Sequence, residues 1–486
     1  MSLLKVAGFL PYLAIAFLNA SVDLAHKITI QNVLLKTYDG DILFILTAVI
    51  NAMILLPFIF LFSPSSFIND KFAKIKVIRI CAVFGLIISV AVLFSYLAGA
   101  FGVAFALTLI LAAQSAIYSP AKYGIIKALV GTERLGTANG VIQALTIVAI
   151  LVSSFLFSFI FENLYIQGEN SEEILKSVYP IGIFLVVFSA LEAFFAYKLP
   201  YISETNEQSG EFELKKYISL SYLRENLKEV RSDKNIWLSI AGLSIFWGIS
   251  QIIIAAFPAH YKAVFNDDSS LAVQAILAAS AIGIAFGSYV AGSMSKLHIE
   301  LGIVPMGAIG IFFSLLFFAF GSSIGVVSLS SFAFGFFGGI FIVPLNAMIQ
   351  YFAPQKTTGK IMAANNFLQN VSMLLFLAIG IGLVYFEIST TGLFVFTALV
   401  CLIGSFYAIL QLPHLFTRLL LLPFLKTKYR FFVEGLQNLP QSGGALLLGN
   451  HISWIDWLVL QAASPRGIRF VMYRTIYNKW YLKQIF

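Results

Sequence analysis

Charged side chains are scarce in this sequence. Only 11% of its 486 residues are Asp, Glu, Lys or Arg, and 59% are hydrophobic, whereas about a quarter of the residues in soluble domains are charged. A chain with so little charge cannot face water on all sides, which excludes an ordinary soluble globular protein. The sequence predicts an all-α protein that crosses a membrane many times.

Cysteine and the common catalytic motifs are also nearly absent. The two cysteines, Cys81 and Cys401, each lie within an apolar run, which excludes a disulfide framework or a cysteine-rich zinc site. The sequence has no closely spaced carboxylates typical of a metal site and no glycine-rich P-loop for ATP hydrolysis. We therefore expect no metal and no cofactor, and we expect any transport to be driven by a gradient or to run downhill.

Twelve apolar runs are long enough to cross a bilayer, which takes about 20 residues. They lie at about 6–33, 42–62, 78–98, 101–119, 139–161, 178–198, 236–257, 271–291, 301–320, 325–350, 361–386 and 390–412.

Basic residues are divided unevenly between the loops. One set of alternate loops carries seventeen Lys and Arg residues, whereas the other set carries only Lys36, Lys176 and Lys262. By the positive-inside rule, the first set and both termini face the cytoplasm. The net charge of +8 is explained by this bias, so we expect no nucleic-acid partner.

The two halves of the membrane part resemble each other. Residues 1–198 hold six spans, 199–235 form a polar cytoplasmic linker, and 236–412 hold six more. Each half has a Pro that is expected to end a span, then about twenty residues, and then an Ala-Asn that opens the next span with a Gln one turn further. These residues are Pro120, Asn139 and Gln143 in one half and Pro344, Asn365 and Gln369 in the other. Such a repeat predicts two six-helix halves with a substrate site between them near the midplane.

This arrangement resembles the major facilitator superfamily. Asp70 and Lys74, four residues apart between spans two and three, resemble the signature of that superfamily, and we assign them a gating role. The glycine-rich stretch Gly335 to Phe341 in span ten fits either a loosened gate or close helix packing.

Span one carries the polar residues Asn19, Asp23, His26, Lys27 and Gln31. An ionisable side chain in a span costs about 2.5–3.5 kcal/mol, so such residues usually pair or line a cavity. Their spacing places them on one helical stripe and predicts an ion pair between Asp23 and Lys27. Either the pair locks helices together or the stripe lines a substrate cavity. Lys122 lies at a span end and is either an interfacial anchor or a ligand for an anionic head group. Glu192 either forms a hydrogen bond between helices or contacts the substrate.

The C-terminal residues have a different character. Residues 413–430 alternate apolar and basic side chains, as in a segment that lies on anionic membrane lipids. Residues 431–486 then read as the start of an α/β domain, with a buried strand predicted at Ala445–Leu448. His451 fits a general base if Asp456, five residues later, holds its other ring nitrogen.

The string from Val433 to Asp456 resembles the first block of the glycerophospholipid acyltransferases. The stretches Asn19 to Lys27, Tyr118 to Ile125 and Ala138 to Gly140 resemble the bacterial lysophospholipid transporter family, in the form fused to such an acyltransferase. The resemblance implies that a lysophospholipid, typically lysophosphatidylethanolamine, moves inward across the bacterial inner membrane for re-acylation. His451 would deprotonate the lysolipid hydroxyl, Asp456 would orient it, and acyl carrier protein or acyl-CoA would be the acyl donor. The candidate substrate-binding residues are Asn19, Asp23, His26, Lys27, Gln31, Tyr118, Lys122, Asn139, Gln143, Asn365 and Gln369.

One block is missing from the acyltransferase pattern. The later Phe-Pro-Glu-Gly-Thr block does not occur before Phe486, so we expect this part to be incomplete and not competent alone. Two other functions stay open at this point: a major facilitator exporter of small amphipathic compounds, and an acyltransferase that its helices merely anchor.

Overall fold

The computed structural model describes most of the membrane part and pieces of the C-terminal part. The described residues are 6–131, 135–168, 170–200, 213–295, 299–354, 358–413, 415, 416, 419, 427, 432–435, 438–440, 443–464, 466 and 468–479. Within these ranges the side chains of Asp70, Asn139 and Gln143 lie outside the description, so the predictions for these three residues stay predictions.

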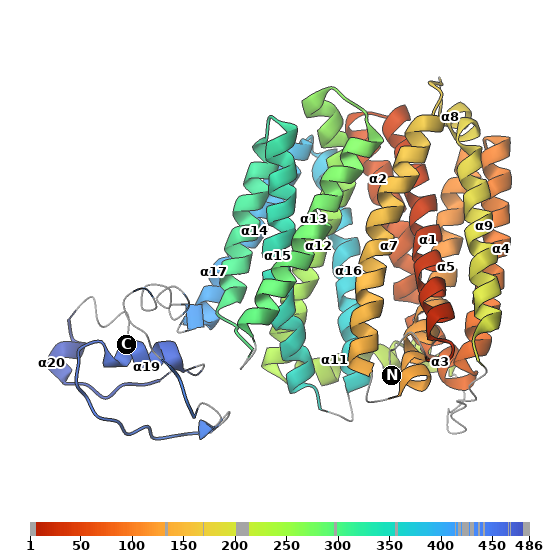
Figure 1. Ribbon diagram of the computed structural model, residues 1–486. Coiled ribbons are helices and arrows are strands. Elements are labelled where there is room, and N and C mark those ends of the chain that lie inside the picture. Colours follow the sequence, from red (N-terminus) through yellow and green to blue (C-terminus); the bar gives the residue numbers. More distant parts are fainter. Residues whose placement is uncertain are drawn as a thin grey trace.

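Long helices standing side by side make up the membrane part (Figure 1). The N-terminal half contains α1 (Phe9–Thr37), α2 (Gly40–Phe60), α3 (Phe62–Lys71), α4 (Lys74–Ala98), α5 (Phe101–Gly124), α6 (Ile126–Val130), α7 (Leu135–Leu164), α8 (Ser171–Ser177) and α9 (Tyr179–Lys198). The C-terminal half contains α12 (Lys234–Phe265), α13 (Ser270–Met294), α14 (Ile303–Phe320), α15 (Ile324–Phe352), α16 (Thr358–Tyr385) and α17 (Thr390–Gln411).

Eleven helices among the described residues are long and apolar enough to cross a membrane. The remaining predicted span, 139–161, falls on α7, whose described apolar part is Val148–Leu164. The twelve predicted spans are therefore confirmed as helices, and several helices run a turn or more beyond the predicted ends.

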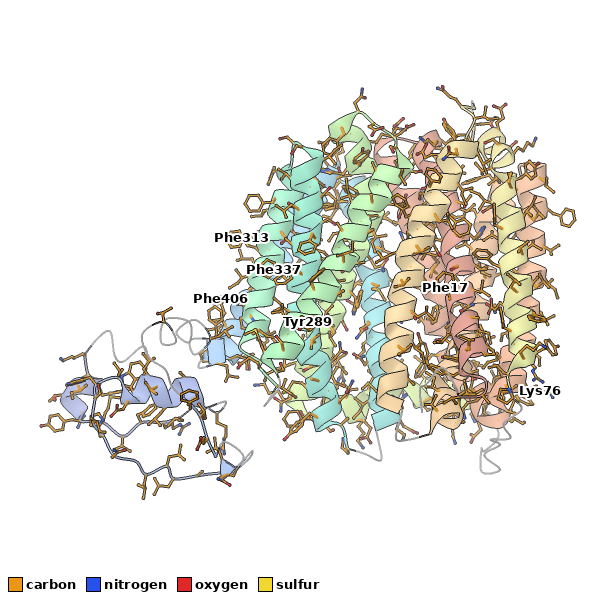
Figure 2. All side chains as sticks on the ribbon, viewed as in Figure 1. Phe17, Lys76, Tyr289, Phe313, Phe337 and Phe406 are labelled. Carbon is orange, nitrogen blue, oxygen red and sulfur yellow. The ribbon has the colours of Figure 1, made fainter. Side chains whose placement is uncertain are left out.

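The outer surface of this bundle is apolar. Large hydrophobic side chains such as Phe94, Phe313 and Phe406 are exposed, and Figure 2 shows Phe313 and Phe406 along the outer edge of the C-terminal half. In water such a surface would cause aggregation, whereas lipid tails solvate it.

Helix pairing divides the bundle into the two predicted halves. In the N-terminal half α1 packs on α7 and α9, and α4 on α5 and α9; in the C-terminal half α15 packs on α13 and α14, and α12 on α16. The halves meet where α2 contacts α12 and α16, and where α7 contacts α13. A shared core of Leu35, Phe44, Phe257 and Phe394 closes this boundary near the C-terminal end of α1.

The prolines of the repeat do not end helices, which corrects that part of the prediction. Pro120 lies inside α5 and Pro344 inside α15. A proline frees the carbonyl four residues earlier, and transmembrane helices tolerate this when a neighbour satisfies that group. Here Ser65 donates to the Ala116 carbonyl at 2.8 Å, and Asn69 donates to the Ile117 carbonyl at 3.1 Å. Polar side chains of α3 therefore let α5 continue past its proline.

The glycine-rich stretch of α15 packs against α13 without intervening side chains. A Cβ at Gly335 would lie 1.8 Å from the Ser280 carbonyl oxygen, and one at Gly287 would lie 1.9 Å from the Phe336 carbonyl oxygen. Only glycine permits this approach of two backbones. Of the two readings of this stretch, the structure shows close helix packing.

The central linker contains two short helices in its described part, α10 (Leu214–Ile218) and α11 (Ser221–Arg231). Tyr217 in α10 donates to the Phe60 carbonyl of α2. Val230 in α11 is fully buried with Ile236 and Ile361 of the C-terminal half. The linker is therefore packed against both halves over this stretch rather than being fully solvated.

The C-terminal part contains α19 (Asp456–Ala463) and α20 (Arg474–Tyr477) among its described residues. Ala445–Leu448 has no regular secondary structure, Leu446 and Leu448 are 82% and 87% exposed, and no strand occurs within the described ranges. The prediction of a buried strand here is wrong, because no described segment packs on these side chains.

Candidate functional site

The polar stripe of α1 divides into two kinds of position. Asn19, His26 and Gln31 are buried, whereas Asp23 and Lys27 are only half-buried. Since α1 packs against α7 and α9 inside the bundle, the accessible surface of Asp23 and Lys27 faces the interior of the N-terminal half or its boundary. These two side chains are the best placed of the stripe to meet a ligand.

Asp23 finds its partner on another helix. Ser115 of α5 donates a 2.6 Å hydrogen bond to the Asp23 carboxylate. The other carboxylate oxygen, Oδ1, is buried without a hydrogen-bond partner among the described residues. The ion pair predicted between Asp23 and Lys27 is therefore not formed: a shorter contact across helices has replaced it.

Lys122 turns into the protein instead of reaching for the membrane surface. Its ammonium group donates to the Asn19 side-chain oxygen at 2.8 Å and lies 5.5 Å from the centroid of the Tyr118 ring. It also interacts electrostatically with Asp23 and Glu192. The bond to Asn19 shows that Lys122 is not an interfacial anchor; it joins the α1 stripe to α5.

Glu192 of α9 completes this cluster. It is buried and interacts with the Tyr118 hydroxyl, Asp23 and Lys122. Oδ1 of Asp23 has no hydrogen-bond partner in the described part of the chain. Buried polar atoms are almost always satisfied, so an unpartnered carboxylate oxygen in a cluster with Lys122 and Glu192 points to water or a polar ligand. We call Asn19, Asp23, Tyr118, Lys122 and Glu192 the polar cluster.

Two polar residues near this cluster, Gln114 and Ser115, were not predicted from the sequence. Ser115 holds Asp23, and Gln114 donates to the Cys81 carbonyl at 2.8 Å. Both lie in an otherwise apolar span and carry no charge. The adjacent polar pair was the available signal, since polar side chains in a span usually face protein rather than lipid.

His26 is bonded on both ring nitrogens. Its Nδ1 lies 2.9 Å from the Tyr96 hydroxyl, and its Nε2 lies 3.1 Å from the Ala104 carbonyl oxygen and 3.2 Å from the Thr108 hydroxyl. The imidazole is almost fully buried between α1, α4 and α5. This geometry suits a structural link between three helices.

The other predicted residues lie apart from the polar cluster. Asn365 and Gln369 bond to each other on α16 at 2.8 Å, and no described bond joins them to α1. Gln31 is buried two turns beyond Asp23 on α1. Lys74 begins α4, and its side chain covers Gly124 at the end of α5.

His451 and Asp456 come together as predicted. Nδ1 of His451 lies 2.9 Å from Oδ2 of Asp456, and the same oxygen accepts the backbone N–H groups of Ile452 at 2.7 Å and Ser453 at 2.9 Å. The hydrogen bonds from Ser453 and Ile452, followed by that from His451, lower the pKa of the Asp456 carboxyl. An ionised Asp456 fixes Nδ1 as the protonated nitrogen of a neutral His451, which leaves Nε2 as the base.

Comparison with known proteins identifies the membrane part. Residues 13–377 match the family model of the Major Facilitator Superfamily. The chain belongs to that superfamily. Residues 430–486 match the Acyltransferase family model, so a segment of this second type follows the major facilitator part.

Relatives and solved structures agree with this assignment. The chain is 31% identical over 270 residues to the lysophospholipid transporter LplT of Photorhabdus laumondii, covering 54% of this chain and 63% of that protein. For the LplT of Yersinia enterocolitica the identity is 28%, with 54% and 62% covered. The chain thus spans a little under two thirds of the length of the curated relatives it matches.

The major facilitator fold is also evident from structural superposition. A bacterial homolog of the human lysosomal transporter Spinster superimposes with a TM-score of 0.64 at 12% identity, covering 83% of this chain and 95% of that one. The nucleoside transporter NupG gives 0.62 at 14% identity, covering 83% and 100%. This major facilitator chain is a multi-pass membrane protein of the transporter type.

Proposed function

We propose that this chain imports lysophospholipids, such as lysophosphatidylethanolamine, across a bacterial cytoplasmic membrane, with both termini in the cytoplasm. The observation that carries the proposal is the polar cluster, which sets charges of both signs side by side inside a major facilitator half. The similarity to proteins named lysophospholipid transporter supports the same substrate class.

The polar cluster matches the chemistry of a zwitterionic head group. Lys122 and the half-buried Lys27 offer cations for a phosphate, and Asp23 and Glu192 offer carboxylates for an ammonium group. An N–H group of the ligand would satisfy the unpartnered Oδ1 of Asp23. The acyl chain needs no polar partner and can stay in an apolar environment while the head group crosses.

The remaining predicted residues take supporting roles in this proposal. Asn139, Gln143, Asn365 and Gln369 occupy equivalent places in the two halves of the repeat and would face the substrate path between them. Asp70 and Lys74 would control opening at the cytoplasmic end, where α4 begins.

A second activity, re-acylation of the imported lipid, is favoured by the His451–Asp456 geometry. Nε2 of His451 would take the proton of the lysolipid hydroxyl while its oxygen attacks the carbonyl of an acyl thioester. The C–S bond then breaks, and the leaving thiolate recovers the proton from His451. Acyl carrier protein or acyl-CoA is the proposed donor.

Uptake of labelled lysophosphatidylethanolamine tests both proposals. The host cells lack their own lysolipid transporter and acyltransferase, and they express the wild-type chain, Asp23→Asn, His451→Ala or the control Asp41→Asn. Asp41 is exposed in the first turn of α2, far from the polar cluster. Lipid species are resolved after uptake, and surface expression is matched.

The outcomes separate the two activities. Transport is supported if unmodified label enters with wild type, Asp41→Asn and His451→Ala but not with Asp23→Asn. Label in diacyl lipid that depends on His451 supports acyl transfer by the C-terminal part. No entry with any form overturns the lysolipid proposal and favours export of small amphipathic compounds; diacyl product without dependence on Asp23 favours an anchored acyltransferase.

A further inference from the structure

The C-terminal half contains a long apolar cavity of about 230 Å³ that the polar cluster does not use. Its walls come from α12, α14, α15 and α17 together with the adjoining Leu301 and Leu412, so every lining residue belongs to one half. Figure 1 shows α14 and α17 at the edge of the bundle away from the N-terminal half. The cavity is therefore separate from a substrate path between the halves.

The cavity runs along the helices. Its lining extends from Asn235 to Ile249 on α12 and from Val400 to Leu412 beside α17. With a rise of 1.5 Å per residue, these stretches are about 20 Å long. One leaflet of a bilayer has about 15 Å of hydrocarbon, so the cavity has the length of one extended acyl chain and the start of its head group.

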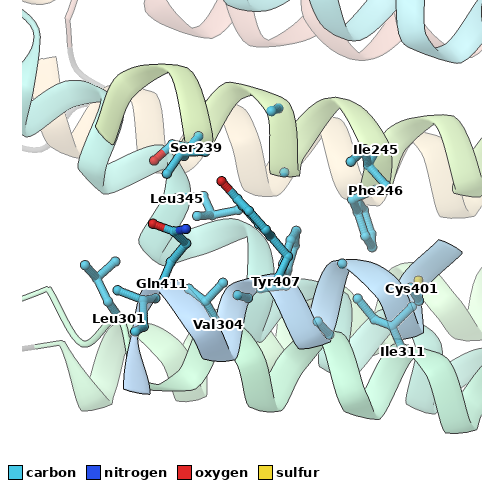
Figure 3. A pocket seen from close by; sticks show the side chains of 18 of the residues that line it. Ser239, Ile245, Phe246, Leu301, Val304, Ile311, Leu345, Cys401, Tyr407 and Gln411 are labelled. Carbon is cyan, nitrogen blue, oxygen red and sulfur yellow. The ribbon is translucent and has the colours of Figure 1, made fainter. Parts of the chain in front are cut away.

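The two ends of the cavity differ in polarity. Ser239 and Gln411 line one end, whereas Phe246, Ile311 and Cys401 line the other (Figure 3). Asn235, one turn before Ser239 on α12, is also a lining residue. Next to the polar end, Lys234 donates to the Gln411 side-chain oxygen at 3.1 Å. A cation and amide groups at one end of an apolar slot complement a phospholipid whose phosphate lies at the membrane surface.

Small residues create the space. Gly242, Ala308, Gly404 and Ala408 line the middle of the cavity, and a Cβ placed on Gly404 would have no neighbour within 4 Å. An apolar cavity of about 150 Å³ in a soluble protein already binds benzene. A larger one that meets the membrane has a ready supply of apolar ligand.

The cavity is open toward the membrane. Ile245 on α12 and Tyr407 on α17 line it and are 39% and 48% exposed. Ile403 and Phe406, beside Tyr407 on α17, belong to the exposed apolar surface of the bundle. A lipid tail can therefore enter sideways between α12 and α17 without unfolding either helix.

We propose that this cavity binds one acyl chain of a resident bilayer phospholipid, whose head group lies at Lys234, Asn235 and Gln411. The lipid fills the gap between α12 and α17 and acts as a packing element of the C-terminal half. The membrane-facing opening favours a bilayer phospholipid over the transported lysolipid, and the site does not depend on the function proposed above.

Photolabelling of the full chain in nanodiscs tests this site. The nanodiscs contain phosphatidylethanolamine and phosphatidylglycerol, with a trace of phosphatidylethanolamine that carries a diazirine on one acyl chain. We compare wild type, Gly404→Phe and the smaller Ala408→Leu with Gly382→Phe, a control on α16 where a Cβ also meets nothing within 4 Å. Labelled peptides are mapped by mass spectrometry, and each variant must show an unchanged elution profile and melting temperature.

The expected result is strong labelling of α12 and α17 peptides around Phe246 and Tyr407 in wild type and in Gly382→Phe. Gly404→Phe lowers this labelling by about tenfold, because losing the burial of two methylene groups already changes affinity by about that factor. The proposal is overturned if Gly404→Phe and Ala408→Leu are labelled as strongly as wild type, or if the label is confined to other helices. Unlabelled lysophosphatidylethanolamine and unlabelled phosphatidylethanolamine are also added, in equal amounts, as competitors. If only the lysolipid removes the label, the cavity binds the substrate, and the proposal of a resident phospholipid is overturned.

Discussion

Lys36 of the N-terminal half and Asp268 of the C-terminal half form a 3.1 Å ion pair. The Lys36 ammonium also lies 3.1 Å from Glu162 at the end of α7, and Glu162 accepts the backbone N–H of Ser270 at the start of α13. Nearby, Lys262 of the C-terminal half lies 2.8 Å from Asp39. Ionic contacts thus tie the two halves together at the end of the bundle where α1 finishes.

Replacing Lys36 by Ala is expected to loosen this end. The change leaves Glu162 and Asp268 without their shared cation, and partly buried carboxylates without a partner are destabilising. Spin labels at the exposed Ile166 and Tyr385, introduced after replacing both cysteines, report the distance between the halves by double electron–electron resonance. We expect an added population at longer distance in Lys36→Ala.

The control for this experiment is Lys176→Ala. Lys176 is the other basic residue of the N-terminal half at this end, and its side chain lies over Gly99 of the same half. The distance distribution should not change in this variant. An unchanged distribution in Lys36→Ala would show that the apolar core around Phe257 and Phe394 holds the halves without ionic help.

Asn19→Leu should weaken lysolipid transport through Lys122. The substitution removes the oxygen that accepts the 2.8 Å hydrogen bond from Lys122 and so frees that side chain to leave the polar cluster. A hydrogen bond to a charged group contributes about 1.5–3 kcal/mol, so we expect KM for uptake to rise about tenfold or more. Asn19→Asp retains an acceptor oxygen and should stay near wild type; equal loss in both variants would contradict a positioning role.

His26→Phe should affect stability more than transport. The substitution leaves the Tyr96 hydroxyl and the Ala104 carbonyl without their partner, which costs about 1–3 kcal/mol per unsatisfied group. We expect a clear fall in melting temperature in detergent, with uptake per folded molecule preserved. Thr37→Val, which loses only a bond to Val33 of its own helix, serves as the control. Lost uptake at an unchanged melting temperature would instead place His26 at the substrate.

A methyl group at Gly287 should disrupt the contact between α13 and α15. A Cβ there would lie 1.9 Å from the Phe336 carbonyl oxygen, whereas a Cβ at Gly292 on the same helix meets nothing within 4 Å. Gly287→Ala therefore requires the two helices to separate, and we expect poor yield or aggregation on size-exclusion chromatography. Gly292→Ala should behave like wild type, since alanine favours a helix. Normal yield for both would mean that the two helices can separate at little cost.

The turn from His451 to Asp456 should survive mild acid. Because the pKa of Asp456 is lowered in the folded turn, its ionised form stabilises the turn fully above the pKa of an unfolded aspartate, about 3.9. This contribution to stability is lost as the pH falls from about 3.9 through the lower pKa that Asp456 has in the folded turn. Carbon-13 NMR of aspartate-labelled full chain in nanodiscs, assigned with Asp456→Asn, should give a midpoint below the usual range. A midpoint at or above that range would contradict the turn geometry.

Apolar length was enough to predict the membrane fold from the sequence. Twelve runs became helices because a bilayer accepts few other structures. The His451–Asp456 contact was also predicted correctly. A separation of five residues across a helix start allows few other geometries once the carboxylate accepts the N–H groups of Ile452 and Ser453.

Contacts between distant segments could not be predicted in the same way. Helical spacing shows that Asp23 can reach Lys27, but it does not show that Ser115, 92 residues later, lies closer. Likewise, Pro120 reads as a helix end until Ser65 is known to bond the Ala116 carbonyl. In both cases the deciding partner comes from another helix, and its position depends on the packing of the whole bundle.

The packed part of the linker, residues 217–230, forms a strap of limited length between the two halves. Tyr217 is held at the Phe60 carbonyl on one side, and Val230 is buried on the other. Between them the chain turns at Leu220, a residue other than glycine in the left-handed region with φ of 58°, and then winds into α11. If the halves part at this end, the strap must release Tyr217, pull Val230 out or straighten at Leu220. The size of the movement is thus limited by the fourteen residues from Tyr217 to Val230, which belong to neither half.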